Sequence, residues 1–170
     1  MKYFWITLPF LLLCGCVGYP KEIAPVENFD LSRYLGTWYE IARLDHPFER
    51  GLEKVTAEYS LREDGGIRVV NRGFSRKDQA WKKAVGKGYF VRSSDEGYLK
   101  VSFFGPFYAS YVIFKLDTQN YQYAWVTSTS KSYLWLLSRT PVVKKEIIQE
   151  FVSKTKNLGY ETDQLIFVEQ

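Results

Sequence analysis

The stretch Gly36-Thr37-Trp38-Tyr39-Glu40-Ile41 decides the fold, because the chain changes there from a helical turn to strands. Before it, residues 29–35 have the composition of a short helical turn that ends at Gly36. After it, apolar and polar residues alternate in short runs, which is the pattern of half-buried strands. The stretch therefore predicts the start of a β domain.

Eight such runs follow one another, and short turns separate most of them. Short connections pair sequence neighbours in space, which gives an antiparallel up-and-down meander. Eight strands of this kind can close into a barrel with room for one small ligand. We therefore predict an all-β fold, an eight-stranded antiparallel up-and-down barrel. The predicted strands are 37–44, 54–62, 67–74, 81–91, 98–104, 108–117, 121–128 and 133–139.

The alternation is interrupted once, by a helical pattern near the C-terminus. Thr140 and Pro141 have the residue types of a helix cap and a first helical residue. Gly159 is suited to the position just after a helix end. We predict a helix over 142–157 outside the barrel, and a last short strand over 165–168. The apolar stripe of this helix consists of Ile147, Ile148, Phe151, Val152, Thr155 and Leu158.

The first residues indicate export. Lys2 precedes a nearly unbroken apolar run over 4–13, which is the layout of a secretory signal peptide and too short for a comfortable membrane span. The run ends in Leu13-Cys14-Gly15-Cys16, which resembles the bacterial lipobox. We predict that residues 1–15 are a lipoprotein signal peptide and that Cys16 is the lipidation site. An ordinary signal peptide with incidental cysteines stays the alternative.

The residues after Cys16 extend this prediction. By analogy with bacterial lipoproteins, Val17 in place of an aspartate suggests an anchor in the outer membrane, with the protein facing the periplasm. Residues 16–28 contain two prolines and small and charged residues, and they are expected to form the lipidated N-terminus and a tether. Residues 29–170 then form one domain, a normal length for a single core.

Composition limits the partners. The chain has 170 residues and a formal net charge of +4, and its basic and acidic residues are interspersed. Nucleic acid is not expected as a partner, because no long basic block occurs. Aromatic residues make up 18% of the chain, and such residues favour strands and often line pockets.

Alternation within each run predicts which residues face the interior. Val55, Ala57, Tyr59 and Leu61 share one face of their run. In the fourth run small residues at 84, 86 and 88 share a face, which suits either a cavity or a bend in the strand. Tyr121, Tyr123 and Trp125 are expected to face outward, so that the C-terminal helix has an apolar surface to cover.

Several segments together carry a family resemblance. The Gly-x-Trp opening, the stretches 48–55, 101–108 and 133–141, and their order resemble the lipocalin family, in particular the lipobox-bearing bacterial lipoprotein lipocalins of the outer membrane related to apolipoprotein D. The resemblance covers nearly all of 29–170. Residues 117–121 match the family's second motif only loosely, and the disulfide of many animal relatives is missing.

The resemblance implies a structural signature of Gly36, Trp38 and Arg139, in which Trp38 closes one end of the barrel and Arg139 packs across its ring. The loops 45–53, 75–80, 105–107 and 129–132 then belong at the open mouth. The family also implies fatty acids or lysophospholipids as ligands. The candidate pocket residues are Tyr59, Val69, Asn71, Gly86, Val101, Phe103, Tyr111, Tyr133 and Trp135, with Tyr111 and Tyr108 nearer the rim.

Basic residues cluster in or beside the mouth loops and are candidates to attract a carboxylate or phosphate group. A solvated rim is the more usual explanation of such a cluster, and any attraction is screened beyond about 8–10 Å at physiological salt. This cluster consists of Arg50, Arg76, Lys77, Lys82 and Lys131.

The sequence offers little catalytic machinery. His46 is the single histidine, there is no Gly-x-Ser-x-Gly elbow, and no cluster has metal-ligand spacing. We predict a membrane-anchored binding protein with no catalytic residue, metal or cofactor. The alternatives are a structural envelope protein with a filled barrel and a lipid-modifying enzyme that uses His46 or Asn71. A homodimer through exposed aromatics such as Phe107 and Tyr160 stays open.

Overall fold

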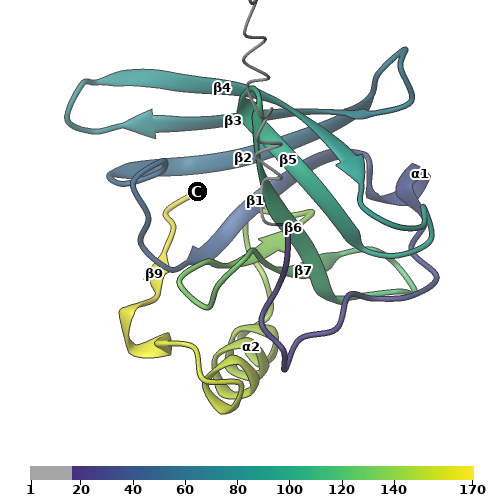
Figure 1. The fold of residues 1–170 in the computed structure, drawn as a ribbon. Coiled ribbons are helices and arrows are strands. Elements are labelled where there is room, and N and C mark those ends of the chain that lie inside the picture. The colour runs from purple at the N-terminus through teal and green to yellow at the C-terminus, as the bar shows by residue number, and fades with distance from the viewer. Residues whose placement is uncertain (1–16) are drawn as a thin grey trace, which may run out of the picture.

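The computed structural model describes residues 17–170, so the predictions for 1–15 and for Cys16 lie outside the described residues. Nine strands and two α-helices follow the order that Figure 1 shows. The helices are α1 (Leu31–Tyr34) and α2 (Lys145–Asn157), and a 3-10 turn, η1, spans Thr162–Gln164. The strands are β1 (Gly36–Arg43), β2 (Leu52–Leu61), β3 (Ile67–Ser75), β4 (Ala80–Phe90), β5 (Tyr98–Phe104), β6 (Phe107–Leu116), β7 (Tyr123–Thr127), β8 (Leu134–Ser138) and β9 (Ile166–Phe167).

Strands β1 to β8 form the predicted antiparallel barrel, and the predicted fold class is confirmed. Each strand pairs with its successor, and β1 also pairs with β8, which closes the sheet. The β1–β2 ladder is short: it runs from Gly36 opposite Tyr59 to Tyr39 opposite Thr56. Beyond it the C-terminal β9 pairs with β1 instead, and the backbone N–H of Lys54 donates to Glu169 O. The C-terminal tail thus fills the gap between β1 and β2.

The mouth of the barrel is flared. Strand β4 pairs with β3 along its length, from Ala80 to Gly88, but with β5 only from Lys87 to Phe90. The β3–β4 hairpin therefore extends beyond the rest of the barrel, as Figure 1 shows. The part of β4 before Lys87 therefore has no partner on its β5 side within the described chain and forms a sheet edge, which the sequence did not predict.

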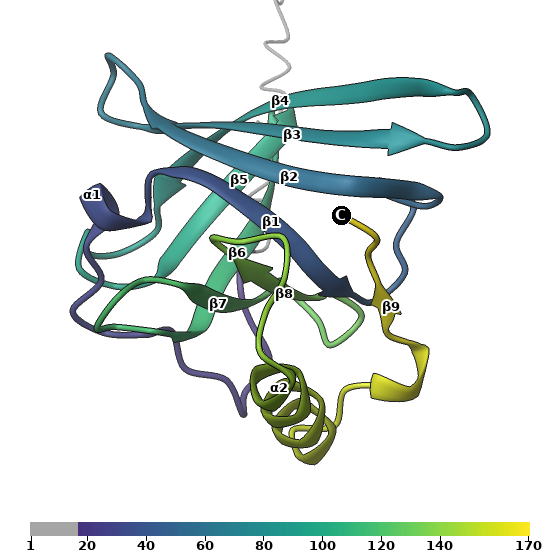
Figure 2. The same cartoon turned by 180° about the vertical axis from the view of Figure 1, so that it is seen from behind.

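Helix α2 packs on the outer surface of the barrel (Figure 2). The side chain of Phe151 is fully buried against Trp125, with ring centroids 5.3 Å apart, so Trp125 faces outward as predicted. The helix begins at Lys145, later than predicted, because Thr140 bonds to Val142 O in a preceding turn rather than capping the helix. Gly159, at φ +83°, follows the C-terminal end as predicted.

Two faces differ from expectation. Tyr121 precedes β7, has a positive φ of 54°, and packs into the barrel's closed end instead of facing outward, where its hydroxyl accepts from the N–H of Asp30 at 3.0 Å. Leu61, expected inside, ends β2 and is 63% exposed. Both lie where a strand meets a turn, and alternation stops there.

The N-terminal segment is bound along the barrel from Gly18 onward. The N–H of Gly18 donates to Ser110 Oγ at 3.0 Å, and the N–H of Val26 donates to Ile113 O at 2.8 Å. Ile23 is only 5% exposed. The described part of the expected tether is therefore bound to the barrel from Gly18 onward.

Candidate ligand-binding site

The closed end of the barrel is built around Trp38. This side chain is fully buried, and its indole N–H donates to Tyr34 O at 2.8 Å. The Arg139 guanidinium lies over the indole, 4.0 Å from the ring centroid, and also donates to Thr37 O and Arg33 O. Gly36 sits under this guanidinium at a positive φ of 93°, a conformation that other residues rarely adopt. These contacts hold the α1 turn against the start of β1.

Three tyrosines form the next layer. The hydroxyl of Tyr111 lies 2.8 Å from that of Tyr34 and 2.7 Å from that of Tyr59. Burial raises the pKa of all three phenols, so they stay neutral. Tyr111 thus belongs to the closed end, and its expected place nearer the rim is wrong. We call Tyr34, Tyr59 and Tyr111 the tyrosine layer.

Little free space remains beside this layer. A cavity of about 10 Å³ lies there, which is room for roughly one water molecule. Gly86 does not enlarge it, because a Cβ added there would lie 3.0 Å from the Phe103 ring, whereas Gly88 does line the cavity. Of the predicted pocket residues, Tyr59, Val69, Val101 and Tyr111 line this cavity. An acyl chain therefore does not fit into the closed half as it stands.

Gly86 pairs with Val69, at the level of this cavity. The remaining predicted pocket residues, Asn71, Phe103, Tyr133 and Trp135, lie toward the mouth, in what we call the mouth half. Phe103 and Trp135 pack against the edge of the interior cluster, and Tyr133 stacks on Trp135 with ring centroids 6.0 Å apart. Asn71 contributes a buried Oδ1 atom that has no hydrogen-bond partner within the described chain. A buried oxygen of this kind is costly unless something donates to it. Tyr108 lies outside this set, because its ring faces Lys87 and Lys100.

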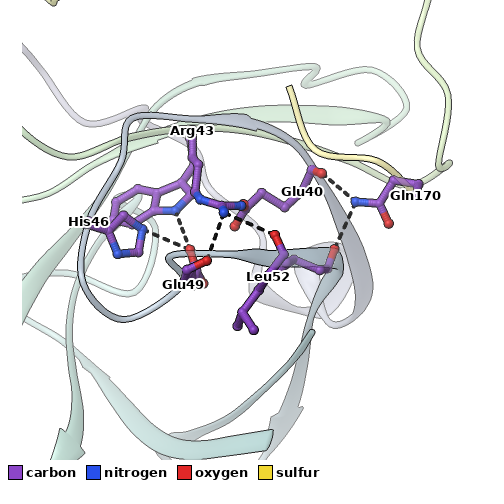
Figure 3. Close-up of polar contacts among 8 residues, drawn as sticks. Glu40, Arg43, His46, Glu49, Leu52 and Gln170 are labelled. Atoms are coloured by element: carbon purple, nitrogen blue, oxygen red, sulfur yellow. Dashed lines mark hydrogen bonds and ion pairs between the residues drawn. The ribbon is translucent and has the colours of Figure 1, made fainter. Parts of the chain in front are cut away.

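A charged cluster of Glu40, Arg43, His46 and Glu49 lies beside this mouth half (Figure 3). A register shift between Glu40 and Ala42 turns Arg43 to the same side as Glu40 and opposite Trp135. The Arg43 guanidinium bonds Glu40 Oε1 at 2.5 Å and Glu49 O at 2.8 Å, and it is 1% exposed. The cluster is thus held inside the barrel by backbone and side-chain partners.

The remaining contacts in the cluster join the loop after β1 to β8. Nε2 of His46 lies 2.9 Å from Glu49 Oε2, to which the Trp135 indole also donates at 3.2 Å. His46 is 4% exposed, and its Nδ1 has no partner within residues 17–170. His46 therefore orders the loop at the mouth. The C-terminal Gln170 closes the opposite side by donating to Glu40 O and Val55 O.

The two carboxyl groups of the cluster differ in charge. Burial and the neighbouring Glu49 raise the pKa of Glu40 well above its usual range, despite Arg43. Burial acts in the same direction on Glu49, but hydrogen bonding and charge from His46 outweigh it and lower the pKa of Glu49. The surroundings thus favour the neutral form of Glu40 and the ionised form of Glu49.

Sequence reasoning missed this charged cluster. The available signal was Glu40 and Arg43 within an otherwise apolar first strand. Simple alternation puts Arg43 on the opposite face from Trp38, so the register shift had to be seen to place it.

The basic residues expected at the mouth are mostly paired. Arg50 bonds Asp45 at 2.9 Å, Lys82 contacts Asp78 at 2.7 Å, and Lys131 contacts Glu22 at 3.1 Å. Arg76 pairs with Glu53 and Glu169. These contacts support a solvated rim more than a site for an anion.

A larger depression of about 300 Å³ lies outside the barrel, between the loop after β1 and the end of α2. Asp45, Lys131 and Glu161 are among its lining residues. Such mixed charge does not suit an acyl chain. No helix within residues 17–170 is long and apolar enough to cross a membrane.

The barrel, its capped end and its lined mouth define the class of protein. The family model described as a lipocalin-like domain matches residues 29–170, and this chain belongs to the lipocalin family. It is 55% identical to the outer membrane lipoprotein Blc of Vibrio cholerae, over 100% of this chain and 99% of that protein. The protein of the same name from Escherichia coli K12 is 47% identical, over 96% of this chain and 93% of its own.

More distant similarities agree in fold. The temperature-induced lipocalin-1 of Arabidopsis thaliana is 34% identical, over 85% of this chain and 81% of that protein. The solved structure of insecticyanin from the tobacco hornworm superposes with a TM-score of 0.70 at 21% identity, over 91% of this chain and 88% of that chain. The similarity to insecticyanin concerns the fold alone.

Proposed function

We propose that this protein binds fatty acids or lysophospholipids in the mouth half of its barrel, for storage or transport in the bacterial cell envelope. The observation that carries this proposal is the contrast within the interior. The closed half is filled, whereas the mouth half combines the aromatic wall of Phe103, Tyr133 and Trp135 with the unpartnered Asn71 Oδ1. An apolar wall with few polar atoms is the usual make-up of a lipid pocket.

The affinity is expected to come from burial of the ligand's acyl chain. Each buried methylene contributes roughly 0.8 kcal/mol, so a partly buried acyl chain is enough for useful binding after association costs. Asn71 would then donate to or accept from the polar end of the ligand. We assign no catalytic role to His46, because its contacts are those of a residue that orders a loop.

A titration tests the ligand proposal. The purified mature protein is titrated with a fluorescent fatty acid, and native mass spectrometry identifies lipids that accompany it. We expect saturable uptake, displaced by a lysophospholipid and not by a two-chain phospholipid. No bound lipid together with no saturable uptake would contradict the proposal.

A filled structural barrel is the second candidate, because the cavity beside the tyrosine layer measures only about 10 Å³. It predicts that the interior stays closed to all acyl chains. The same titration separates the two candidates.

We further propose that lipid on Cys16 anchors the protein to the outer membrane, facing the periplasm. The lipobox-like stretch before Cys16 supports this location, and so do the bacterial relatives, which are outer membrane lipoproteins. Mass spectrometry of the mature N-terminus is expected to show an acylated Cys16. Replacement Cys16→Ser should abolish the acyl mass, whereas Cys14→Ser should leave it. An acylated Cys16→Ser protein would contradict the assignment.

A further inference from the structure

The turn between β5 and β6 exposes two large apolar side chains. Phe104 and Phe107 face each other across the turn and are 69% and 74% exposed. Single exposed apolar residues are normal, but two phenylalanines at one hairpin tip form a protruding apolar point. We call the segment 104–107 the β5–β6 tip.

The outer surface next to this tip is basic and aromatic. The Tyr108 ring lies 5.4 Å from Lys100 Nζ and 6.0 Å from Lys87 Nζ. Val85 on the neighbouring strand is 47% exposed. Apolar tips beside tyrosine and lysine are typical of residues at a membrane surface, where long side chains keep their charge in the headgroup layer. The lysines would also attract anionic lipids.

The described chain begins beside the same strand, β6. Gly18 is held against Ser110, three residues along β6 from Phe107. Ring packing of Tyr19 on Tyr98, at 5.1 Å, holds the next residue. In Figure 1 the purple start of the described chain runs beside β6. Only Val17 separates Gly18 from Cys16, so chain length alone limits that separation to about 7 Å.

We propose that the β5–β6 tip inserts into the surface of the same bilayer that holds the lipid on Cys16, so that the barrel mouth opens toward the membrane. The inference rests on the proposed lipidation of Cys16 and not on the identity of the ligand. A short tether keeps the tip at the bilayer surface, which favours a bilayer over a second copy of the chain as its partner. Acyl chains would then enter the mouth without crossing bulk water.

Site-directed spin labelling tests this orientation. In the mature lipidated protein Cys16 is the sole cysteine and its sulfur is acylated, so an introduced cysteine is the only free thiol. A nitroxide is attached to Phe107→Cys or, as the control, to Leu61→Cys, which is exposed at the other end of the barrel. The proteins are placed in vesicles of phosphatidylethanolamine and phosphatidylglycerol, and accessibility to oxygen and to a water-soluble nickel complex is measured.

The label at 107 is expected to be open to oxygen and shielded from nickel, whereas the label at 61 stays open to nickel. Equal nickel access at both positions would overturn the proposal. Broadening between labels at 107 would show that the tip meets a second copy, and this too would overturn it.

A second measurement uses the unlipidated Cys16→Ser protein, whose vesicle binding depends on the barrel alone. We expect the pair Phe104→Ser and Phe107→Ser to weaken flotation with these vesicles by about tenfold or more. The matched pair Leu61→Ser and Val142→Ser, both at exposed positions away from the tip, should leave it unchanged. Equal flotation of the two pairs would contradict insertion.

Uptake of the fluorescent fatty acid by the same variants separates this inference from the proposed function. If the variants still take up the fatty acid but the tip substitutions do not change flotation, the docking surface is contradicted and ligand binding stands. If the tip substitutions weaken flotation but no variant takes up the fatty acid, ligand binding is contradicted and the docking surface stands.

Discussion

The closed end and the mouth of the barrel are built from opposite kinds of side chain. At the closed end Trp38 and the tyrosine layer are packed and hydrogen-bonded, and Arg139 covers the Trp38 ring while it donates to Thr37 O and Arg33 O. At the mouth, buried polar atoms of Arg43, His46 and Asn71 have no partner within the described chain. The difference teaches that buried polar groups are satisfied at the closed end and left open at the mouth, which is where we propose that the ligand binds. Replacements at the two ends should therefore have different effects on stability and on binding.

The largest effect is expected at Trp38. Replacement Trp38→Ala removes a fully buried indole and the ring that Arg139 covers, and it should lower the free energy of unfolding by about 3–5 kcal/mol. Chemical denaturation measures it. Trp81→Ala is the control, because this side chain is 60% exposed and its loss should change little. Similar losses of unfolding free energy in both variants would contradict the stabilising role of the closed end.

The next largest effect on stability is expected at Arg43. Replacement Arg43→Met removes a buried guanidinium and leaves Glu40 Oε1 and the carbonyls of Glu49 and Leu52 without this donor, at a cost of about 3 kcal/mol. Arg50→Met, at an exposed ion pair in the loop after β1, should change stability little. Equal effects in chemical denaturation would show that the charged cluster does not hold the mouth.

The two buried carboxyl groups should give opposite pH dependences. The raised pKa of Glu40 means that its contribution is full below 4.5 and is lost as pH rises. Glu40→Gln should therefore gain stability relative to the original protein with rising pH. The lowered pKa of Glu49 means that its contribution is present above 4.5 and is lost in acid, so the deficit of Glu49→Gln should shrink as pH falls. Denaturation over a pH series measures both, and parallel curves for the two variants would contradict the assigned charges.

The smallest effect on stability is expected at Asn71. Replacement Asn71→Leu removes a buried oxygen without a partner and should stabilise the protein by about 1 kcal/mol. The same change should weaken ligand binding by about tenfold, because the polar end of the ligand loses its contact. Denaturation and the fluorescent titration measure the two quantities. A loss of stability with unchanged binding would show that Asn71 is structural.

The sequence predicted the regular parts of the molecule and missed the irregular ones. Alternation predicts the strands and the inward side of Tyr59 and Val69, because every second residue of a regular strand faces the core. It fails for Arg43, which a register shift turns inward, and for Tyr121, which precedes its strand. It also misplaced Tyr111, whose hydroxyl reaches the closed end. Tyr160, expected to be exposed, is 3% exposed and donates to Thr127.

The four tryptophans that follow the proposed signal peptide provide the most direct test of where the ligand binds. Trp38 lies at the closed end, Trp135 at the mouth, Trp125 under α2 and Trp81 in the β3–β4 hairpin. Indole N–H signals in an NMR spectrum are recorded with a fatty acid that carries a nitroxide close to its carboxyl group. The account predicts saturable broadening that is strongest at Trp135 and weakest at Trp38 and Trp125. Broadening that is strongest at Trp38, or absent at all four, would contradict binding in the mouth half.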